Sequence, residues 1–463
     1  MNPTPLRALL TLTMAVCILA LMSCSEENTT SPVRNGDDVT NAGLQKQAAH
    51  FLVEYSGNKN RAEAAVRAAG GAVEKVLDPI GVIKATGLTD QEAAALRSKP
   101  GIQHVTRDVS IQWLPTSVAA TVAPLQAIGA VHTSTQPADA AWYFKQWALP
   151  VIHAPEAWAV TTGNNEVRVG VLDTGISPTH IDLQGKYDLM KSINLSPSNP
   201  DDPVDYIDRR GHGTWVSGII STNNITIAGV APDITMVGVK VLGDNGHAPW
   251  ANVIDGILYA VDNAECDILN LSLGGRVVKA QNGRLIALLQ RTINYARNKG
   301  ALIICAAGNG RIDLDHDGNE ITMPAEAAGA MAISATGQIK GTMPDAVAGY
   351  TNYGRSVINI AAPGGNGPLM GAIHTDRIIS CFAPARAAAL GLPNPDNWYT
   401  WGLGTSASAP HVSGAAALVQ SKTGNSNPGF IKTRLQNSAD DCGAPGVDPY
   451  YGKGRLNVGN AVQ

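Results

Sequence analysis

Three stretches of the chain place an aspartate, a histidine and a serine where an apolar run ends or begins. Asp173 closes an apolar, strand-like run at a Thr-Gly turn, and His212 stands between two glycines just before a second apolar run. Ser406 lies in the small-residue stretch 404–414, which we expect to be a turn that opens an apolar helix over 414–420. A serine hydroxyl attacks a carbonyl when a base takes its proton, and a carboxylate must hold that base in the right tautomer. These three residues therefore predict acyl-transfer chemistry.

A fourth residue could stabilise the negative charge that such an attack creates on the carbonyl oxygen. Asn309 follows the apolar run 301–306, and its side-chain amide can donate a hydrogen bond to an oxyanion. The backbone N–H of Ser406 would be a second donor, because the start of a helix leaves N–H groups unpaired at the positive end of its dipole. Asn309 also precedes a glycine, and that pair is common in ordinary turns.

Apolar runs that alternate with helical patterns predict the elements that would position these residues. Continuous apolar strands separated by helices indicate a parallel sheet with helices on both faces. In such a sheet functional groups gather at the carboxyl ends of the strands, where Asp173 and Asn309 stand. The predicted helices are 152–160, 250–263 and 285–299. The predicted strands are 167–172, 235–241, 268–273, 301–306, 331–335 and 358–361.

The motifs around Asp173, His212 and Ser406 together resemble those of the subtilisin-like serine proteases (subtilases), which carry aspartate, histidine and serine in this order along the chain. The resemblance implies a subtilisin-like α/β fold, with a parallel sheet and helices on both faces. It also implies a serine endopeptidase that hydrolyses peptide bonds through an acyl-enzyme. We therefore expect residues 142–463 to be the catalytic domain of a monomer that acts on proteins or peptides, with no extra module after it.

The resemblance also implies how a substrate would bind. Segments 243–248 and 272–275 would hold an extended peptide between them as an added strand. Glycines in the cleft and an apolar lining beside them favour large apolar or aromatic substrate residues at P1 and P4. Asn309 matches the oxyanion asparagine of the family. The implied substrate-binding residues are Leu242, Gly246, Trp250, Ser272, Leu273, Gly274, Gly275 and Gly308.

The region before the catalytic domain resembles a subtilase prodomain. Residues 48–114 alternate strand and helix patterns in the order β-α-β-β-α-β, and a capping box begins at Thr89. This order predicts a small α+β ferredoxin-like domain, which in the family inhibits the enzyme until it is removed. Residues 115–141 are rich in Ala, Pro, Thr and Ser and predict a linker with a processing site. We expect the enzyme to cut itself between about Trp113 and Trp142.

The N-terminus predicts export from a bacterial cell. Residues 1–23 have the basic start and apolar centre of a signal peptide, and the residues before Cys24 resemble a lipobox. Lipid attached at Cys24 would make the protein an outer-membrane or cell-surface lipoprotein, with 24–47 as a polar tether. Ordinary signal cleavage nearby would release a secreted protein, so both outcomes stay open.

Two groups of carboxylates suggest calcium as a cofactor. Asp182 matches the calcium-binding aspartate of the family, although its partner loop 222–227 is shorter than in calcium-rich relatives. Asp313, Asp315 and Asp317 stand at alternate positions before a glycine, as in the first half of an EF-hand loop. The alternative for these three is a solvated acidic loop.

The cysteines and one proline complete the predictions for the catalytic domain. Cys266 and Cys305 lie in or beside apolar strands and would be buried free thiols, whereas Cys381 and Cys442 lie in loop-like sequence and could pair. Met323-Pro324 matches a peptide bond that the family holds cis.

Other functions fit the sequence less well. A single Asp-Thr-Gly excludes a one-chain aspartic protease, and the triad order excludes an α/β-hydrolase. A sedolisin would replace His212. Charged residues make up 16% of the chain and the net charge is −4, which argues against nucleic acid as a partner. A non-catalytic, envelope-anchored peptide-binding protein remains the alternative from another class.

Overall fold

The computed structural model describes residues 49–115, 124–127, 136–196, 201–367 and 373–463. The signal segment, Cys24 and the tether lie outside these residues. No helix in the described ranges is long and apolar enough to cross a membrane.

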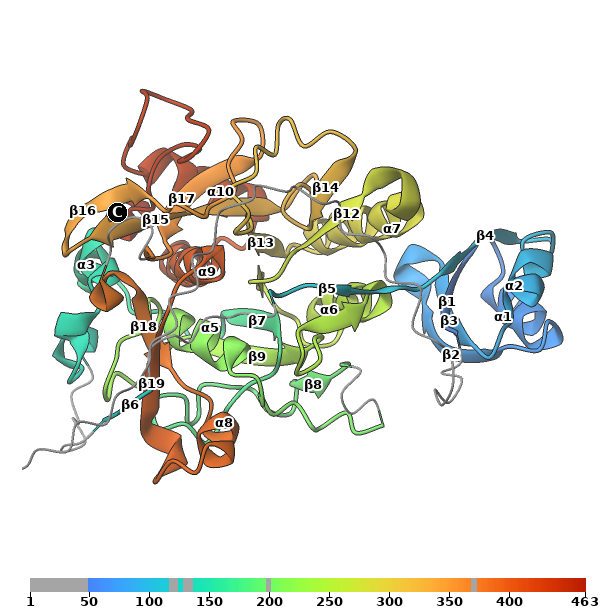
Figure 1. Ribbon diagram of the computed structural model, residues 1–463, viewed down its shortest axis with the longest axis horizontal. Coiled ribbons are helices and arrows are strands. Elements are labelled where there is room, and N and C mark those ends of the chain that lie inside the picture. The colour runs from blue at the N-terminus through green and yellow to red at the C-terminus, as the bar shows by residue number, and fades with distance from the viewer. Residues whose placement is uncertain (1–48, 116–123, 128–135, 197–200, 368–372) are drawn as a thin grey trace, which may run out of the picture. The chain divides into compact units, whose positions relative to one another are not determined.

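A single large sheet lies at the centre of the described chain (Figure 1). Its strands are β7 (Arg168–Asp173), β8 (Ile193–Asn194), β9 (Thr235–Lys240), β11 (Ile268–Leu271), β13 (Leu302–Ala306), β15 (Met331–Ile339), β16 (Thr342–Val347) and β17 (Ile358–Pro363). They follow the order β16-β15-β13-β11-β7-β9-β8, and β17 pairs with β15. All neighbours are parallel except β15 and β16, which run antiparallel. The six predicted strands are therefore confirmed, with ends shifted by a few residues.

Helices cover both faces of this sheet, as the apolar runs predicted. The main ones are α5 (His212–Ile220), α6 (Trp250–Asp262), α7 (Lys279–Asn298) and α9 (Thr405–Thr423). Strand β13 shows how the two layers form. Leu302 and Ile304 pack with residues of α5 and α9, whereas Ile303 and Cys305 pack with residues of α6 and α7. Alternate side chains of this buried strand thus pack into two apolar cores, one on each face of the sheet.

Two predicted helices differ from the structure. Within the run 152–160 only α4 (Ala154–Trp158) is helical, because Pro155 can only enter a helix in its first turn, and a separate short helix, α3 (Ala148–Val151), precedes the run. Helix α9 begins at Thr405, so the stretch predicted as a turn is helical. Pro410 lies inside α9, and the carbonyl that would bond to its missing N–H finds another donor, described below.

The N-terminal part of the described chain forms a separate four-stranded antiparallel sheet. Its strands follow the order β2-β3-β1-β4, and a capping box at Thr89 begins α2, as predicted. The extended segment after β4 leaves this sheet and pairs with a strand beside α6. The elements here are β1 (Phe51–Tyr55), α1 (Lys59–Ala68), β2 (Ala72–Leu77), β3 (Val82–Thr86), α2 (Asp90–Leu96), β4 (Ile102–Arg107) and β5 (Ser110–Gln112).

Part of the predicted linker has regular structure. Leu125 and Gln126 form strand β6, which pairs with β19 (Trp398–Gly402), and Ala140 is buried in the main core. These described residues of the predicted linker thus add apolar contacts and strand hydrogen bonds to the catalytic part. The remaining elements are β10 (His247–Pro249), β12 (Gly275–Val278), β14 (Glu320–Met323), β18 (Ile378–Cys381), α8 (Pro384–Ala389), α10 (Pro428–Ser438) and α11 (Val458–Ala461), with single turns at Asp78–Ile80, Pro137–Asp139, Tyr143–Lys145, His374–Asp376 and Pro395–Asn397.

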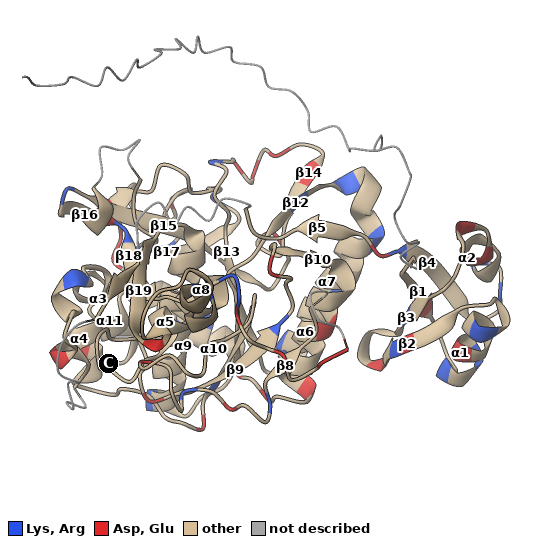
Figure 2. Cartoon of the chain, turned by 60° about the horizontal axis from the view of Figure 1, so that its bottom comes forward, with Lys and Arg blue, Asp and Glu red and all other residues tan. Residues whose placement is uncertain are grey.

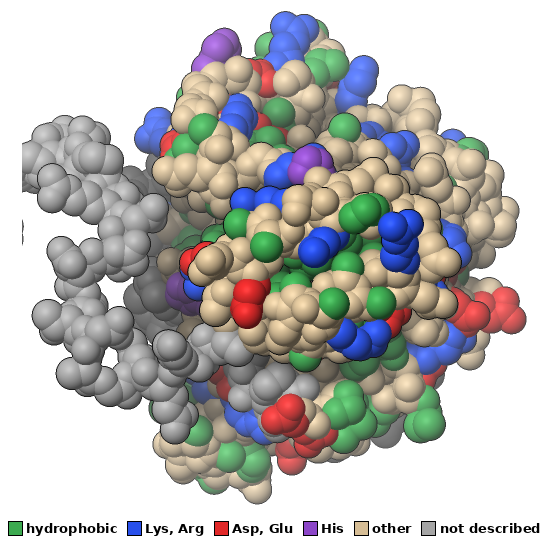
Figure 3. Space-filling view, turned by 90° about the vertical axis from the view of Figure 1, so that its right-hand side faces the viewer, with side chains coloured by type: hydrophobic (Ala, Val, Ile, Leu, Met, Phe, Trp, Pro, Cys, Tyr) green, Lys and Arg blue, Asp and Glu red, His purple; other side chains and the backbone are tan. Residues whose placement is uncertain are grey.

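The charged side chains are spread over the described chain (Figure 2), its cysteines are free and one proline bond is cis. Lys and Arg (blue) and Asp and Glu (red) are scattered over the elements in Figure 2, and the face drawn in Figure 3 mixes both signs among apolar side chains. The four cysteines in the described part are free. Cys381 ends strand β18 and is buried, and the pairing with Cys442 that the sequence left open is not formed. The Met323-Pro324 bond is cis, as predicted.

Candidate active site

Asp173 and His212 form a buried, doubly hydrogen-bonded pair. Asp173 is the last residue of β7, and His212 is the first residue of α5. His212 Nδ1 lies 2.8 Å from one carboxylate oxygen of Asp173 and 2.9 Å from the other. The Asp173 side chain is fully buried, and that of His212 is 3% exposed. The carboxylate therefore fixes the imidazole ring and leaves Nε2 as the nitrogen that can accept a proton.

Asp208 holds the start of helix α5, and the sequence analysis missed it. Its carboxylate accepts hydrogen bonds from the backbone N–H groups of Arg210, Gly211 and Thr214, at 2.7–3.1 Å, and from the Thr214 hydroxyl at 2.7 Å. The hydroxyl of Thr174 lies 2.9 Å from Asp208 and 3.2 Å from Asp173. Asp208 stands three residues before the N-cap Gly211, so its role becomes clear only once the helix start is known. Asp208 thus ties the backbone of His212 to the strand that carries Asp173.

Ser406 lies in the first turn of α9 and is held by Ser272. The Ser406 hydroxyl donates to the Ser272 carbonyl at 3.0 Å, and the Ser272 hydroxyl donates to the Ser406 carbonyl at 2.9 Å. That carbonyl is the one that Pro410, four residues later, cannot satisfy. Because Pro410 has no N–H, the Ser406 carbonyl is left free to accept the hydrogen bond from Ser272. Ser406 and His212 line the same cavity of about 310 Å³.

Asn309 lines the same cavity. The hydrogen bonds that hold its side chain go to its oxygen and leave its amide nitrogen available. Its oxygen accepts from the Thr405 N–H and the Thr405 hydroxyl, each at 2.9 Å. This bonding turns Nδ2 away from Thr405, and Asn309 is exposed. Gly404 has a φ of 141°, and a Cβ there would come within 3.3 Å of the Asn309 Nδ2. A glycine at position 404 therefore leaves room for the Asn309 amide beside the first turn of α9, where the Ser406 N–H lies.

The predicted substrate segments already hold a strand, and it comes from this chain. Strand β5 pairs antiparallel with β10, and the N–H of Trp113 donates to the Gly246 carbonyl at 3.0 Å. On the other side, the Gly274 N–H donates to the Trp113 carbonyl at 3.0 Å. The Trp113 ring packs edge-on against Trp250, with centroids 5.2 Å apart. Residues 110–114 thus lie where a substrate strand is expected.

The other predicted substrate residues line this region or support it from behind. Leu242, Leu273 and Trp250 are buried in the apolar cluster that also contains Trp113 and Leu114. A Cβ on Gly308 would lie 2.4 Å from the Asn352 amide, so a glycine is needed there for close packing. A Cβ on Gly275 would meet Ile111 at 2.5 Å. The structure therefore brings the predicted subsite residues together.

The structure does not place calcium ligands around Asp182, where calcium was predicted, because the groups that surround its carboxylate are donors. The N–H groups of Ile225, Thr226 and Ile227 and the hydroxyl of Tyr399 all donate to Asp182, at 2.7–3.2 Å. A cation needs oxygen acceptors around it. Burial raises the pKa of the Asp182 carboxyl, and the Tyr399 hydrogen bond acts in the opposite direction.

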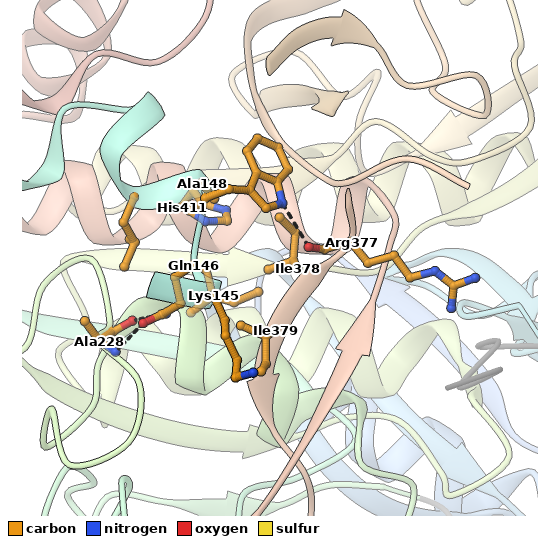
Figure 4. Close-up of a pocket in the computed structure, with 11 residues that line it drawn as sticks. Lys145, Gln146, Ala148, Ala228, Arg377, Ile378, Ile379 and His411 are labelled. Carbon is orange, nitrogen blue, oxygen red and sulfur yellow. Dashed lines mark hydrogen bonds between the residues drawn. The ribbon is translucent and has the colours of Figure 1, made fainter. Parts of the chain in front are cut away.

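The carbonyls of the partner loop are also used. Ile225 and Thr226 accept from the N–H groups of residues 141 and 142, and the Ile227 carbonyl accepts from the Thr222 hydroxyl. Figure 4 shows Gln146 bonded to both backbone groups of Ala228, at 2.8 Å each. The carbonyls of residues 225–228 are thus occupied, and hydrogen bonds hold this part of the loop.

The acidic loop at Asp313 does not assemble a cation site either. Asp313 bonds to His316, Asp315 accepts from residues 355 and 356, and Asp317 faces Lys279. The three carboxylates thus point to different partners. Nowhere in the described ranges do three or more His, Cys, Asp or Glu side chains gather in a group that could hold a metal ion.

Comparisons with known proteins agree with this geometry. Residues 164–454 match the family model described as the subtilase family. The chain is 32% identical over 335 residues to thermitase of Thermoactinomyces vulgaris, covering 71% of this chain and 99% of that protein. It is also 32% identical over 330 residues to a thermophilic serine proteinase of Bacillus sp. (strain AK1), covering 70% and 69% of the two chains.

Solved structures share the fold. The epidermin leader peptide processing serine protease of Staphylococcus aureus matches with a TM-score of 0.73 at 23% identity, over 90% of this chain and 98% of that one. A lanthipeptide protease matches with a TM-score of 0.59 at 26% identity, over 69% and 93% of the two chains.

The arrangement at Asp182 predicts stability that does not depend on calcium. Tyr399→Phe removes one donor to a buried carboxylate and should lower the free energy of unfolding by about 1–3 kcal/mol. Denaturant unfolding should give the same loss with excess EDTA and with added Ca²⁺. Tyr143→Phe is the matched control, since the hydroxyl of Tyr143 has no hydrogen-bond partner within the described ranges. A loss that appears only with Ca²⁺ would show that Asp182 is a metal ligand.

The contacts of Asp208 predict a kinetic defect without loss of substrate binding. Asp208→Asn removes the charge that holds the start of α5, so His212 loses its fixed position. Turnover should fall about tenfold or more with KM nearly unchanged, because about 1.4 kcal/mol of lost stabilisation costs a factor of ten. Steady-state kinetics on a peptide substrate measure this. Asp441→Asn, on an exposed loop, makes the same charge change and should leave turnover intact; equal effects of both variants would contradict the account.

Proposed function

The chain belongs to the subtilase family and is a serine endopeptidase, and from this premise we propose that Asp173, His212 and Ser406 are its catalytic triad, with Asn309 in the oxyanion hole. The observation that carries the proposal is the buried Asp173–His212 pair opening on the cavity that Ser406 also lines. Burying a carboxylate against an imidazole costs free energy. Beside a serine at a helix start, such a pair can take the proton of the serine hydroxyl.

The proposed reaction proceeds in two stages. The Ser406 hydroxyl leaves the Ser272 carbonyl, gives its proton to His212 Nε2 and attacks the substrate carbonyl. The Asn309 amide and the Ser406 N–H donate to the resulting oxyanion. His212 then gives the proton to the leaving amine, and a water molecule activated in the same way releases the acyl group. Asp173 stays ionised and stabilises the imidazolium throughout.

We further propose that residues 48–114 are an inhibitory, ferredoxin-like prodomain. The order β2-β3-β1-β4 suits that arrangement. Glu54, on β1, is 1% exposed and meets Arg284 and Arg291 of α7 at 2.5 and 2.8 Å. Lys75, on β2, meets Asp255 of α6 at 2.7 Å. These pairs support a docked prodomain whose extension, residues 110–114, blocks the cleft in the manner of a substrate.

The same segment supports a substrate preference and a processing region. Ile111, Trp113 and Leu114 bring apolar side chains to the cleft, and the last two are at most 2% exposed. This favours substrates with large apolar residues, including P1 and P4. Because the segment runs toward Ser406, we propose that the first self-cleavage occurs in the stretch that follows Leu114, within the predicted linker 115–141.

The proposed cellular setting follows from the N-terminal sequence. Residues 1–23 would direct export from a bacterial cell, and Cys24 would either carry a lipid anchor or be lost with the signal peptide. The product is then an outer-membrane or cell-surface lipoprotein or a secreted protease. Although subtilases generally bind calcium, calcium has no part in the proposed reaction.

The triad assignment predicts the state in which the protein accumulates. Ser406→Ala should leave the chain uncut, because the nucleophile for self-cleavage is gone, whereas the wild type should lose its prodomain. Intact-mass spectrometry of both proteins after export measures this. Ser421→Ala, at another serine of the same helix, is the control and should process normally. Prodomain loss from pure Ser406→Ala, with no other protease added, would contradict the assignment.

The contact between Asp108 and α6 predicts how prodomain docking depends on pH. Pro249 cannot cap α6 with its side chain, and Asp108 accepts from the Ala251 N–H at 3.3 Å instead. Burial raises the pKa of Asp108 from 3.8 to about 7. The docked carboxyl therefore holds its proton more tightly than the free one, so this group favours docking at low pH and weakens it as the pH rises through about 7.

Release of activity after processing should consequently quicken as the pH rises from about 4 to about 7, between the pKa values of the free and the docked carboxyl. Asp108→Asn stays neutral at every pH and should remove most of this dependence. Asp90→Asn, at an exposed prodomain carboxylate, should retain it. The time course of peptide hydrolysis after processing is the measurement, and an unaltered pH dependence in Asp108→Asn would contradict the prediction.

A further inference from the structure

One wall of the cavity beside Ser406 is not used by the strand in the cleft. Residues 110–114 contact segments 243–249 and 274–275, which lie on the side of the acyl group. The other wall comes from different elements, namely the loop before α5, helix α5, α8 and β19. Since the cleft segment runs toward Ser406, this second wall faces the substrate residues that follow the scissile bond. Its members beyond the catalytic residues include Arg210, Trp215, Phe382, Arg386, Thr400 and Trp401.

This wall is rich in hydrogen-bond donors that have no acceptor. Within the described ranges, the indole N–H groups of Trp215 and Trp401, the Thr400 hydroxyl and the Nε of Arg210 are buried without a hydrogen-bond partner. The Trp215, Trp401 and Thr400 residues are 2–8% exposed. A buried donor without an acceptor costs free energy, so four of them in residues that line one cavity set this wall apart.

The charge on this wall has one sign. Among the residues that the structure describes, the cavity is lined by Arg210 and Arg386 and by no Asp or Glu side chain. One N–H of Arg386 donates to the Arg210 carbonyl at 2.6 Å, which brings the two residues together. The Arg386 guanidinium also lies over the Phe382 ring, 5.9 Å from its centroid. Burial lowers the pKa of Arg210, and the neighbouring Arg386 lowers it further.

The carboxylates nearest to Arg210 have other partners. Asp173 bonds to His212, Asp208 holds the start of α5, and Asp244 meets Lys240 at 2.8 Å. The Arg210 guanidinium itself donates to the Pro115 carbonyl at 2.7 Å. Pro115 directly follows the cleft segment, so this bond shows that the guanidinium reaches an oxygen of a bound chain beside Ser406.

We propose that this wall binds a carboxylate of the substrate on the leaving-group side, so that the enzyme prefers peptides with an acidic group just after the cleaved bond. The proposal rests on the proposed triad function and adds to it a substrate class. An Asp or Glu side chain at the first or second position after the bond supplies such a carboxylate, and so does a free C-terminus there. A carboxylate offers acceptors to the unpaired donors and a charge to both arginines, whereas a lysine would be repelled.

The test compares peptides that share one acyl-side sequence and differ after the cleaved bond. Quenched fluorescent peptides with Glu, Gln or Lys at the first and then the second position give kcat/KM for each. The Glu to Gln ratio should be about five- to tenfold, the factor expected of a partly buried charge pair, and Lys should be cleaved more slowly than Gln. Added salt should reduce the ratio. A second pair, ending there in a free acid or an amide, identifies the chain terminus as the source if only that pair differs.

Variants assign the preference to this wall. Arg386→Gln should bring the Glu to Gln ratio close to one, and Arg386→Lys should keep part of it. Arg209→Gln, at an exposed arginine paired with Asp205, should retain the wild-type ratio and wild-type activity. Equal cleavage of the Glu and Gln peptides and of the acid and amide peptides by the wild type would overturn the proposal while leaving the protease function intact. If no peptide were cleaved and Ser406 failed to react with a fluorophosphonate, the proposed function itself would fail.

Discussion

The structure depends on the burial of one carboxylate. Asp173 is fully buried at the end of a central strand, and a buried charge is tolerated only where partners compensate for lost hydration. His212 provides one partner, and the Thr174 N–H, 2.7 Å from the carboxylate, provides another. The partners must keep their places, so the start of α5 has to be fixed. Asp208 does this, which explains why a second carboxylate is buried close to the first.

Two helices begin at this edge of the sheet, and each supplies a different group to the site. Helix α5 begins at His212 and presents an imidazole that the sheet holds from behind. Helix α9 begins at Thr405 and places the Ser406 N–H in its first turn, where an oxyanion would form. Pro410 and Ser272 join the second helix to the sheet through the Ser406 carbonyl. The pairing of β5 with β10 is a third feature. It shows that the cleft binds an extended strand, here one from the same chain.

Much of this could be predicted from the sequence, because the signals are local. The six apolar strands, the helices around them and the residues at the strand ends follow from hydrophobic runs and glycine turns. Three features could not be predicted in this way. The start of α9 was placed too late because small residues carry little helical pattern, and its contact with Ser272 joins distant parts of the chain. The acidic residue Asp208 has a capping position that becomes clear only once the helix start is known. The calcium site at Asp182 was expected from spacing, but spacing does not show whether a loop turns its N–H groups or its carbonyls inward.

The most direct test of the account is to identify the residue that reacts with a serine-directed fluorophosphonate. The probe is applied to native wild-type protein after export, to the His212→Ala variant and to denatured protein, and the labelled peptide is found by mass spectrometry. The account predicts that Ser406 alone is labelled in the native protein and that labelling is lost in the other two samples. Labelling at another serine, or equal labelling of Ser406 without His212, would contradict the assignment of these residues as one catalytic unit.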